Sequence, residues 1–518
     1  MSDLAIPGFA TSEDTSRFKD RFPELSGEYN TLGMTGLICS PVGFGTYRCD
    51  VRVAEHRAAL TKAIRMGVNL IDTSSNYANG NAERMIGETL RSMIGANEIQ
   101  RNEIIIVGKG GYIQGENYER ISKIMEDEDT DLSPGSEFSE LVRYSKGLWH
   151  SIHPDFLKDQ ITRSLERLGL ETIDVYLLHN PEYYIQWAIK DGIPEDEARD
   201  TYESRIQKAF IYLETEVIRG RIQWYGISSN TFPKSEDSID RTALEHIWRS
   251  TQSVPGKGQV SHFGVIQFPM NLYERGGLLE KNQERSTRSV IEFAREKNLG
   301  ILINRPLNAF GNNMLIRLAD FPVREFPPVE EISELVHDLK LQEDEFKNGP
   351  LKDITMNPQA YDAVKKLLSV GEWLDGKWQH LPSYDEWRDL LYSVIKPRIQ
   401  YAFDLLQETM KANREIFTLL QEYAESIDVV MEHITNFYTT KASERSMEIH
   451  KALDEVLPSE DSILSLSQKA ILMLRSIQGV SSVLIGMRSD EYVDDVIYGL
   501  QAKKIEGMEE LWSNLNLD

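Results

Sequence analysis

Four side chains that can move a proton or stabilise a charge each follow a short apolar run. Asp72 follows NLI, Tyr77 comes five residues later in IDTSSNY, Lys109 follows IIIVG, and His179 follows DVYLL. Each has an ordinary structural explanation when taken alone, as a turn residue, a packing residue or a paired charge. Their joint placement after three different apolar runs instead favours one common site.

Together these four residue types can transfer a proton to or from an oxygen atom. A tyrosine with a pKa of about 10 is a poor acid or base at neutral pH, and an adjacent lysine ammonium is expected to lower that pKa. An aspartate would hold the lysine charged and in place, and the histidine would orient a substrate oxygen. Proton transfer to oxygen needs a partner that attacks carbon, and a nicotinamide hydride donor is the natural counterpart.

Eight short apolar runs, with helical patterns between them, are expected to position these residues. The predicted strands are Val42–Tyr47, Asn69–Asp72, Ile104–Lys109, Asp174–His179, Trp224–Ser228, Val265–Phe268, Gly300–Asn304 and Val483–Gly486. Amphipathic helices fit between them, for example Asp155–Leu168 and Thr287–Lys297. Eight strand–helix repeats predict an α/β fold, a closed (β/α)8 TIM barrel, in which chemistry takes place at the C-terminal ends of the strands.

Two segments interrupt this repeat. Tyr112–Ile152 is much longer than an ordinary strand-to-helix loop. The segment 309–461 separates the seventh strand from the last helix–strand pair, and we predict that it forms a mainly helical cap near the active site. Within it, DFPVREFPPVEEISELVHDL is expected to be irregular because of its prolines, and 361–457 is expected to be helical. The predicted domains are an N-terminal extension over 1–28, a barrel over 29–308 and 462–518, and this insertion.

Composition narrows the location and the partners. Lys and Arg number 57 against 82 Asp and Glu, a net charge of −25, which disfavours binding to nucleic acid or anionic lipid. A run of about 18 apolar residues, as a membrane span needs, is absent, and the acidic N-terminus does not resemble a signal peptide. We therefore expect a cytoplasmic protein. Cys39 and Cys49 are too few for a zinc ribbon or an iron–sulfur cluster, and no metal site is predicted.

The same residues resemble a known family. Asp72, Tyr77, Lys109 and His179 match, in order, the tetrad of the aldo-keto reductase superfamily, including the spacing within IDTSSNY. YNTLGMTGLICSPVGFGTYR is similar to the N-terminal β-hairpin and first strand of that family, and WYGISSN, VIQF and VSSVLIGM are similar to later strands. The resemblance implies NAD(P) bound without a Rossmann domain. It also implies reversible interconversion of an aldehyde, ketone or aldose with an alcohol, with Tyr77 as general acid and base.

The resemblance also implies cofactor contacts. Ser228, with Ser229 or Asn230, would meet the nicotinamide carboxamide, and GISSN leaves open which of the two takes part. In INRPL, Asn304 stands where the family has an aromatic ring that stacks on the nicotinamide, and Arg305 stands for a serine. The full predicted set is Gly45, Thr46, Ser228, Ser229, Asn230, Gln267, Asn304, Arg305, Pro306, Leu307, Gly486, Met487, Arg488 and Asp495, with Tyr47 in the substrate pocket.

The adenosine end of the cofactor leaves two alternatives open. The family uses basic residues and a Glu-Asn pair there, whereas GMRSDEYVDDV offers Arg488 as its only base and Asp495 in place of the glutamate. Family resemblance favours NADP, but carboxylates that bind free ribose hydroxyls would favour NAD.

Function also has an alternative at this stage. The first hypothesis is an oxidoreductase acting on a small carbonyl or sugar, and Arg305 suggests a polar, sugar-like substrate. The second is a nucleotide-binding sensor whose insertion binds a protein partner. The sequence does not predict an oligomeric state.

Overall fold

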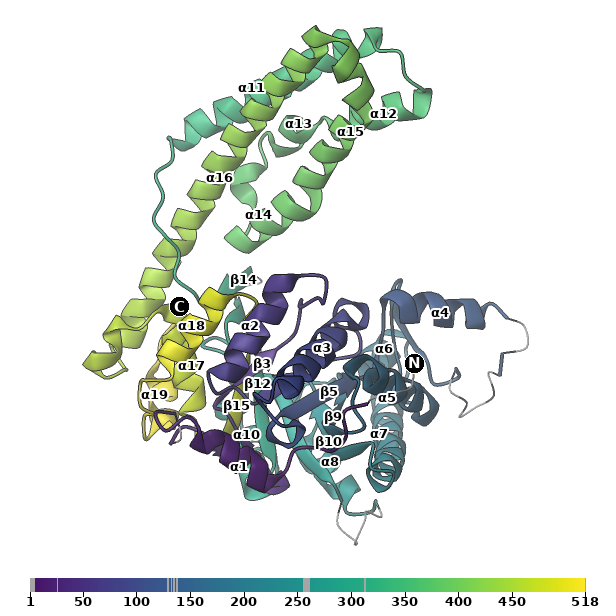
Figure 1. Cartoon of the computed structure of the whole chain (residues 1–518), viewed down its shortest axis with the longest axis vertical. Helices are drawn as coiled ribbons and strands as arrows, with labels where there is room; N and C mark the ends of the chain where they lie inside the picture. The colour runs from purple at the N-terminus through teal and green to yellow at the C-terminus, as the bar shows by residue number, and fades with distance from the viewer. Residues whose placement is uncertain are drawn as a thin grey trace. The chain divides into compact units, whose positions relative to one another are not determined.

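The computed structural model of the chain describes residues 5–25, 27–127, 130, 131, 133, 136, 138–254, 261–311 and 314–517. It divides into two compact units (Figure 1). The larger unit comprises Met1–Leu307 and Val456–Asp518, and the smaller unit comprises Asn308–Glu455.

The larger unit contains a closed barrel of eight parallel strands, which confirms the predicted (β/α)8 fold. In barrel order the strands are β3 Val42–Gly45, β4 Leu70–Asp72, β5 Ile105–Gly110, β9 Ile173–His179, β10 Ile222–Ser228, β11 Phe263–Pro269, β12 Gly300–Asn304 and β15 Val480–Ile485. The prediction for the last strand was wrong at both ends. Two serines hide its start: Ser482 is buried in the strand, and the Ser481 hydroxyl accepts a hydrogen bond from Ile301 N–H at 3.2 Å.

Helices surround this barrel (Figure 1). The main ones are α2 Ala54–Arg65, α3 Asn81–Gly95, α5 Pro154–Leu168, α7 Glu195–Ile218, α8 Leu244–Thr251, α10 Val290–Glu296, α17 Leu466–Arg475 and α18 Asp490–Gly499. Shorter helices are α1 Ser12–Asp20, α6 Tyr183–Lys190, α9 Gly276–Leu279 and α19 Met508–Asn514. In α5, Leu157, Ile161 and Leu168 recur at helical spacing and are buried, which explains why the apolar periodicity located this helix.

An N-terminal β-hairpin, as predicted, closes the amino-terminal end of the barrel. Its strands are β1 Asn30–Thr31 and β2 Ile38–Cys39. Between them, Gly33 has a φ of 54°, and a Cβ there would overlap the backbone of Leu299 and Gly300 at the start of β12. Glycine is required because only a residue without a side chain permits both that φ and that approach. The hairpin does not cover the opposite end of the barrel, where the strands end.

The long segment after β5 has its own secondary structure. It contains α4 Gly115–Met125 and a three-stranded sheet of β6 Tyr112–Ile113, β8 Leu148–His150 and β7 Val142–Ser145. This sheet follows directly from β5, and it therefore begins at the end of the barrel where the strands finish.

The smaller unit is mainly helical, which confirms that part of the predicted fold. It contains the hairpin β13 Asn308–Gly311 and β14 Met314–Arg317, a π-helix at Leu391–Ile395, and the helices α11 Val329–Asn348, α12 Pro358–Leu367, α13 Val370–Leu374, α14 Tyr384–Leu390, α15 Lys396–Ala412 and α16 Arg414–Asp454. Helix α11 packs along α16 (Figure 1). The unit has its own buried core, which includes Trp378, Trp387, Ile427 and Ile434.

The irregular structure predicted for DFPVREFPPVEEISELVHDL was wrong from Val329 onward. The prolines all precede helix α11, and Pro328 occupies its N-cap position. Proline is tolerated there because the first backbone N–H groups of a helix have no partner within the helix. The prolines therefore mark where the helix begins.

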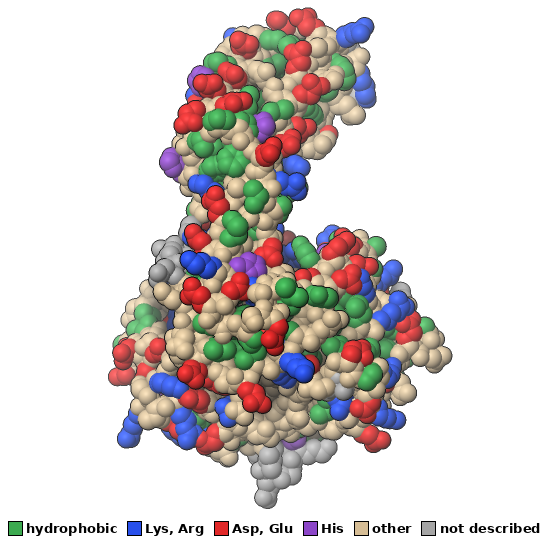
Figure 2. All heavy atoms as spheres, turned by 90° about the vertical axis from the view of Figure 1, so that its left-hand side faces the viewer, with side chains coloured by type: hydrophobic (Ala, Val, Ile, Leu, Met, Phe, Trp, Pro, Cys, Tyr) green, Lys and Arg blue, Asp and Glu red, His purple; other side chains and the backbone are tan. Residues whose placement is uncertain are grey.

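Acidic and basic side chains are interspersed on the face of the molecule drawn in Figure 2. Among the described residues, none of the helices has the length and apolar character needed to cross a membrane. The described His, Cys, Asp and Glu side chains likewise form no group of three that could hold a metal ion.

Candidate active site

Polar side chains lie at the carboxyl ends of consecutive barrel strands. Asp72 is the last residue of β4, and Lys109 is the penultimate residue of β5. His179 and Ser228 end β9 and β10 and are paired in register. Because parallel strands end at the same rim, this placement brings together residues that are far apart in the sequence.

A buried ion pair forms the centre of this rim. Lys109 Nζ lies 2.6 Å from Asp72 Oδ1 and donates a second hydrogen bond of 2.9 Å to the Thr73 carbonyl. Gln267 Nε2 donates to the same Asp72 oxygen at 2.7 Å. Lys109 is fully buried, so removing Asp72 would leave an uncompensated charge inside the barrel, which is strongly destabilising.

Tyr77 lies beside this pair, in the turn Tyr77–Gly80 that precedes α3. The Lys109 ammonium is 5.2 Å from the centre of its ring. The turn is tight because Ala78 and Asn79 both have positive φ, at 47° and 55°. The tight turn therefore places Tyr77 beside the Asp72–Lys109 pair, five residues after the end of β4.

His179 is positioned by contacts on both sides. Its Nδ1 lies 3.0 Å from the Ser74 hydroxyl, and its backbone carbonyl is 2.8 Å from His150 Nε2. Its ring meets the ring of Tyr77 edge-on, with 6.1 Å between centroids. All four tetrad residues are thus gathered at one rim of the barrel.

Burial controls the protonation of this group. Burial raises the pKa of Tyr77 well above its usual value, and the Asp72 carboxylate raises it further. Burial lowers the pKa of Lys109 against the opposing effect of Asp72. Burial, with smaller effects of Lys109 and His150, lowers the pKa of His179 well below its usual value.

The direction of the Tyr77 shift corrects the expectation from sequence. A lysine was expected to lower the pKa of this phenol. Burial instead raises the pKa, and the Asp72 carboxylate that pairs with Lys109 adds to the increase. Tyr77 is therefore a protonated phenol at neutral pH.

The residues predicted to contact the nicotinamide carboxamide belong to two different groups of hydrogen-bonded side chains. Ser228 Oγ and Asn304 Nδ2 both donate to Gln267 Oε1, at 3.0 and 3.2 Å. Asn304 Oδ1 is buried and has no described hydrogen-bond partner. Ser229 points elsewhere, since its hydroxyl lies 2.9 Å from that of Thr242. Of the two alternatives left by GISSN, the exposed Asn230 is therefore better placed than Ser229.

Gly45 and Thr46 lie at the end of β3. Gly45 is paired with Asp72 in register, and the Thr46 hydroxyl donates to the Asp72 carbonyl at 2.9 Å. Tyr47, predicted to line the substrate pocket, is 62% exposed and meets the Tyr77 ring edge-on at 5.4 Å. The structure thus places Tyr47 next to the tetrad with most of its ring accessible.

The segment after β12 is held by an ion pair. Arg305 has a φ of 52°, and its guanidinium lies 2.9 Å from Glu274 Oε1. Pro306 is buried and Leu307 is half-buried in the turn that follows. The pairing of Arg305 with Glu274 weakens the argument that this arginine selects a sugar-like substrate.

The segment between β15 and α18 contains one basic residue, Arg488. Gly486 is exposed, Met487 is buried and Arg488 is half-buried, directly before the N-terminus of α18. Asp495 accepts hydrogen bonds from Ser467 Oγ at 2.6 Å and Gln468 Nε2 at 2.8 Å. Its carboxylate therefore connects α18 to α17.

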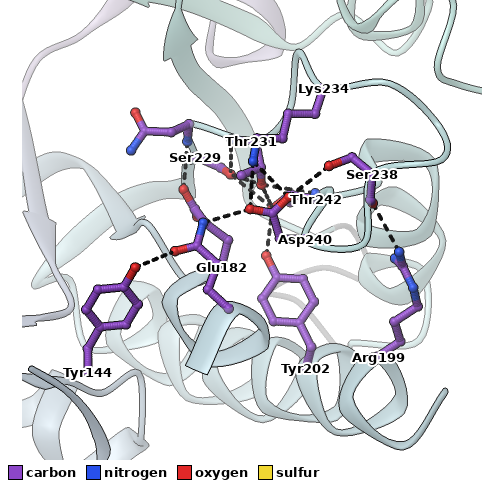
Figure 3. Close-up of polar contacts among 12 residues, drawn as sticks. Tyr144, Glu182, Arg199, Tyr202, Ser229, Thr231, Lys234, Ser238, Asp240 and Thr242 are labelled. Atoms are coloured by element: carbon purple, nitrogen blue, oxygen red, sulfur yellow. Dashed lines mark hydrogen bonds and ion pairs between the residues drawn. The ribbon is translucent and has the colours of Figure 1, made fainter. Parts of the chain in front are cut away.

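The sequence did not indicate a second polar cluster, drawn in Figure 3 around the loop that follows β10. Glu182 is buried, and its Oε1 accepts a hydrogen bond of 2.8 Å from Asn230 N–H. Asp240 pairs with Lys234 at 2.7 Å and accepts from Gln186 at 2.8 Å. The sequence HNPE does not indicate a role for Glu182, because its partner is a backbone group in the loop that follows β10.

A group of aromatic rings flanks His179. Tyr112 meets the His179 ring at 4.6 Å between centroids and the Tyr183 ring at 5.3 Å, and Tyr144 meets Tyr183 at 4.5 Å. Tyr112 and Tyr144 were not predicted as site residues from the sequence. The strands β6 and β7 that carry them are too short to show a periodicity.

Comparison with known proteins identifies the family. The sequence pattern of the aldo/keto reductase family matches residues 41–506 of this chain. The chain belongs to the aldo/keto reductase family. This confirms the resemblance that was based on the tetrad and the flanking strands.

Named proteins from several organisms match parts of the chain. The NADH-specific methylglyoxal reductase of Escherichia coli is 26% identical over 156 residues, covering 29% of this chain and 40% of that protein. The L-galactose dehydrogenase of Arabidopsis thaliana is 29% identical over 161 residues, covering 30% and 39%. The matched segments therefore span less than half the length of either relative. The structure of an aldo-keto reductase from Bacillus halodurans, in its holo form, aligns with 94% of this chain and 95% of that chain at a TM-score of 0.45 and 14% identity.

Proposed function

We propose that this chain is an NAD(P)-dependent oxidoreductase that interconverts a carbonyl compound and an alcohol. The observation that carries the proposal is the buried Lys109–Asp72 pair beside Tyr77 and His179 at the open rim of the barrel. Membership of the aldo/keto reductase family supports the same reaction class. The oxidoreductases named among its relatives are consistent with it.

In the direction of reduction, Tyr77 donates its phenolic proton to the carbonyl oxygen. His179, uncharged at neutral pH because burial lowers its pKa, orients that oxygen. Asp72 fixes Lys109, and the ammonium limits the charge that develops on the Tyr77 oxygen as the proton leaves. In oxidation the same groups act in reverse, with Tyr77 as the base.

The residues present fit a nicotinamide carboxamide, which needs one acceptor and one donor. Asn304 Oδ1 is a buried acceptor without a described partner, and the Ser228 hydroxyl lies beside it through their shared contact with Gln267. A bound nicotinamide would supply or accept the hydride. Asn304 replaces the aromatic ring of the family, so orientation of the nicotinamide would depend on hydrogen bonds in place of stacking.

The choice between NADP and NAD depends on the surroundings of Arg488. Helix α18 begins with Asp490 and Glu491, and the nearby Lys62 ammonium is paired with Asp494 at 2.7 Å. A 2′-phosphate would meet Arg488 among these carboxylates, whereas the free ribose hydroxyls of NAD could donate hydrogen bonds to them. The proposal therefore includes both NADP and NAD. Asp495 contributes to it indirectly, through the hydrogen bonds that join α18 to α17.

The proposed substrates are small aldehydes, ketones and aldoses. Tyr47 and the rings of Tyr112 and Tyr183 provide flat surfaces next to the tetrad. Such surfaces suit an apolar substrate or the apolar face of a sugar ring.

The alternative function is a nucleotide-binding sensor whose smaller unit binds a protein partner. The observation that favours it is the loss of the stacking ring at Asn304, together with the separate core of the smaller unit. A sensor would bind nucleotide without turning over a carbonyl.

The decisive test is nucleotide binding followed by turnover. NADH and NADPH are titrated separately while tryptophan fluorescence is followed, and carbonyls and aldoses are then screened. Tyr77→Phe is expected to lower kcat at least about 100-fold with little change in nucleotide affinity, since it removes the proton donor alone. Tyr176→Phe is the matched control, because it removes another buried phenol oxygen, one without a described hydrogen-bond partner. Binding without turnover would reject the enzyme in favour of the sensor, and full activity in Tyr77→Phe would reject Tyr77 as the general acid of the proposed mechanism.

A further inference from the structure

The loop between β10 and α8 is fixed at both of its ends by hydroxyl groups (Figure 3). Thr231 Oγ1 lies 3.1 Å from Ser229 Oγ and 2.9 Å from Thr242 Oγ1. The Tyr202 hydroxyl of α7 lies 2.7 Å from Thr242 Oγ1. This buried cluster brings the first and last residues of the loop together and turns Ser229 away from the barrel rim.

Asn230 is exposed between the buried Ser229 and Thr231. Its backbone N–H donates a hydrogen bond to the side chain of Glu182. Glu182 Oε1 accepts the Asn230 N–H, while Glu182 Oε2 is buried and no described hydrogen bond reaches it. Glu182 is 1% exposed and lies three residues after His179. One carboxyl group therefore connects the segment after β9, the strand that ends at His179, to Asn230 in the segment after β10, the strand that ends at Ser228.

We infer that Glu182 is a positioning residue for the nicotinamide cofactor, and that the affinity for this cofactor depends on whether the Glu182 carboxyl is ionised. The inference rests on the proposed function, which brings the carboxamide to Ser228, with Asn230 as the neighbouring contact that the sequence predicted. It adds a residue outside the tetrad and outside the predicted cofactor contacts. Its effect is indirect, through the Asn230 backbone.

The physical basis is the strength of one hydrogen bond. An ionised carboxylate accepts an N–H much more strongly than a neutral carboxylic acid does. Burial raises the pKa of Glu182 to about 7, the Asn230 N–H and the Ser229 hydroxyl oppose this shift, and the Asp240 carboxylate adds to it. The other titratable groups that interact with Glu182 are the phenols of Tyr112, Tyr183 and Tyr202, all uncharged near neutrality, and Asp240 is paired with Lys234.

The sign of the pH dependence follows from this. Above about pH 7 the carboxylate is ionised and holds Asn230 firmly, so the nucleotide meets a preformed segment. Below that pH the carboxyl gains a proton and the bond weakens, so binding must also order the segment. Loss of the charge in a charge-assisted bond corresponds to an affinity change of about five-fold.

The test measures the dissociation constant of NADH by fluorescence between pH 6 and pH 8.5, using the whole chain. NADH is chosen because a 2′-phosphate itself ionises near pH 6, with a pKa of about 6 for its second proton. The wild-type protein is expected to bind NADH about five-fold more tightly at pH 8.5 than at pH 6. Glu182→Gln keeps an acceptor but cannot ionise, and is expected to bind with the weaker affinity at both values.

Two further variants separate positioning from general stability. Glu214→Gln removes another buried carboxylate, one that accepts hydrogen bonds from His262, and is expected to leave the pH dependence unchanged. Asp240→Asn removes the charge that raises the pKa of Glu182, and should shift the midpoint to lower pH. A purely structural role of Glu182 would not move that midpoint.

The outcomes are distinct. The inference is overturned if the wild-type affinity does not change with pH, if Glu182→Gln retains the wild-type pH dependence, or if Asp240→Asn leaves the midpoint in place. Should Glu182→Gln fail to fold, the Asp240→Asn midpoint decides alone. If the wild-type protein binds neither NADH nor NADPH, the proposed function itself fails and the inference fails with it.

Discussion

At the scale of single residues, the site combines a buried charge pair with a neutral acid. The Asp72–Lys109 pair is fixed by hydrogen bonds from Gln267 to Asp72 and from Lys109 to the Thr73 carbonyl. Tyr77 and His179 then have pKa values displaced away from neutrality in opposite directions. Both groups are uncharged over the range in which the enzyme would work.

This protonation predicts the pH dependence of turnover. Since the pKa of Tyr77 is raised and that of His179 is lowered, kcat for reduction at saturating cofactor should be flat between about pH 6 and 9. Oxidation needs the phenolate of Tyr77, so its kcat should rise about ten-fold per pH unit over the same range. Steady-state kinetics in both directions measure this, and a reduction rate that falls with a midpoint near pH 6.5 would show that His179 titrates after all.

Sequence located the tetrad because each member ends or follows an apolar run, and barrel topology gathers strand ends. It could not locate Glu182, whose partner is a backbone N–H in the loop that follows the neighbouring strand. Nor could it decide between Ser229 and Asn230, because the Ser229 hydroxyl is turned toward Thr231 and Thr242, on the same loop. It also gave the wrong direction for the Tyr77 pKa, since burial is a property of the folded chain.

At the scale of elements, apolar runs located the eight barrel strands, and apolar periodicity located helices α5 and α10. Helix α5 begins one residue from its predicted start, and both end at Leu168. The predicted bounds were wrong where a strand begins with buried serines and where prolines precede a helix. The buried Ser481 and Ser482 interrupt the apolar run at the start of β15. The prolines before α11 favour an irregular structure when the sequence is considered alone, but a helix begins directly after them.

The hairpin that closes the barrel predicts a specific sensitivity at Gly33. Gly33→Ala should lower the free energy of unfolding of the larger unit by about 1–3 kcal/mol, because alanine disfavours its positive φ and its Cβ would meet the backbone of Gly300. Thermal unfolding measures the change. Gly95→Ala is the matched control, since Gly95 ends α3 with open space around it and alanine there should be neutral or slightly stabilising. Equal effects of the two substitutions would contradict the argument.

At the scale of the whole molecule, the chain has two units with separate cores. The smaller unit buries Trp387 completely, and its indole Nε1 donates to Thr435 Oγ1 at 2.9 Å. The existence of a helical segment was evident from sequence, but its internal arrangement was not. Several of its helices are short, and the buried residues that unite them are far apart along the chain.

Trp387→Ala should therefore affect the smaller unit selectively. The loss of a fully buried indole is expected to cost about 3–5 kcal/mol of stability in that unit. Calorimetry should show one unfolding transition moved to lower temperature, while NADH binding by the barrel at 25 °C is retained. Loss of binding together with the shifted transition would show that the barrel site depends on the smaller unit, as the predicted cap requires.

The pairing of β12 with β15 has a consequence for the synthesis of the chain. The register joins Ile301 to Val480 and Leu302 to Ser482, and the whole smaller unit lies between these strands in sequence. While the ribosome makes that unit, β12 and β3 remain unpaired edges, a state that favours aggregation. A smaller unit that folds first shortens the effective loop that must close, which lowers the entropic cost of adding the final strand. In a cell, the helical core thus influences how long the barrel stays open during translation.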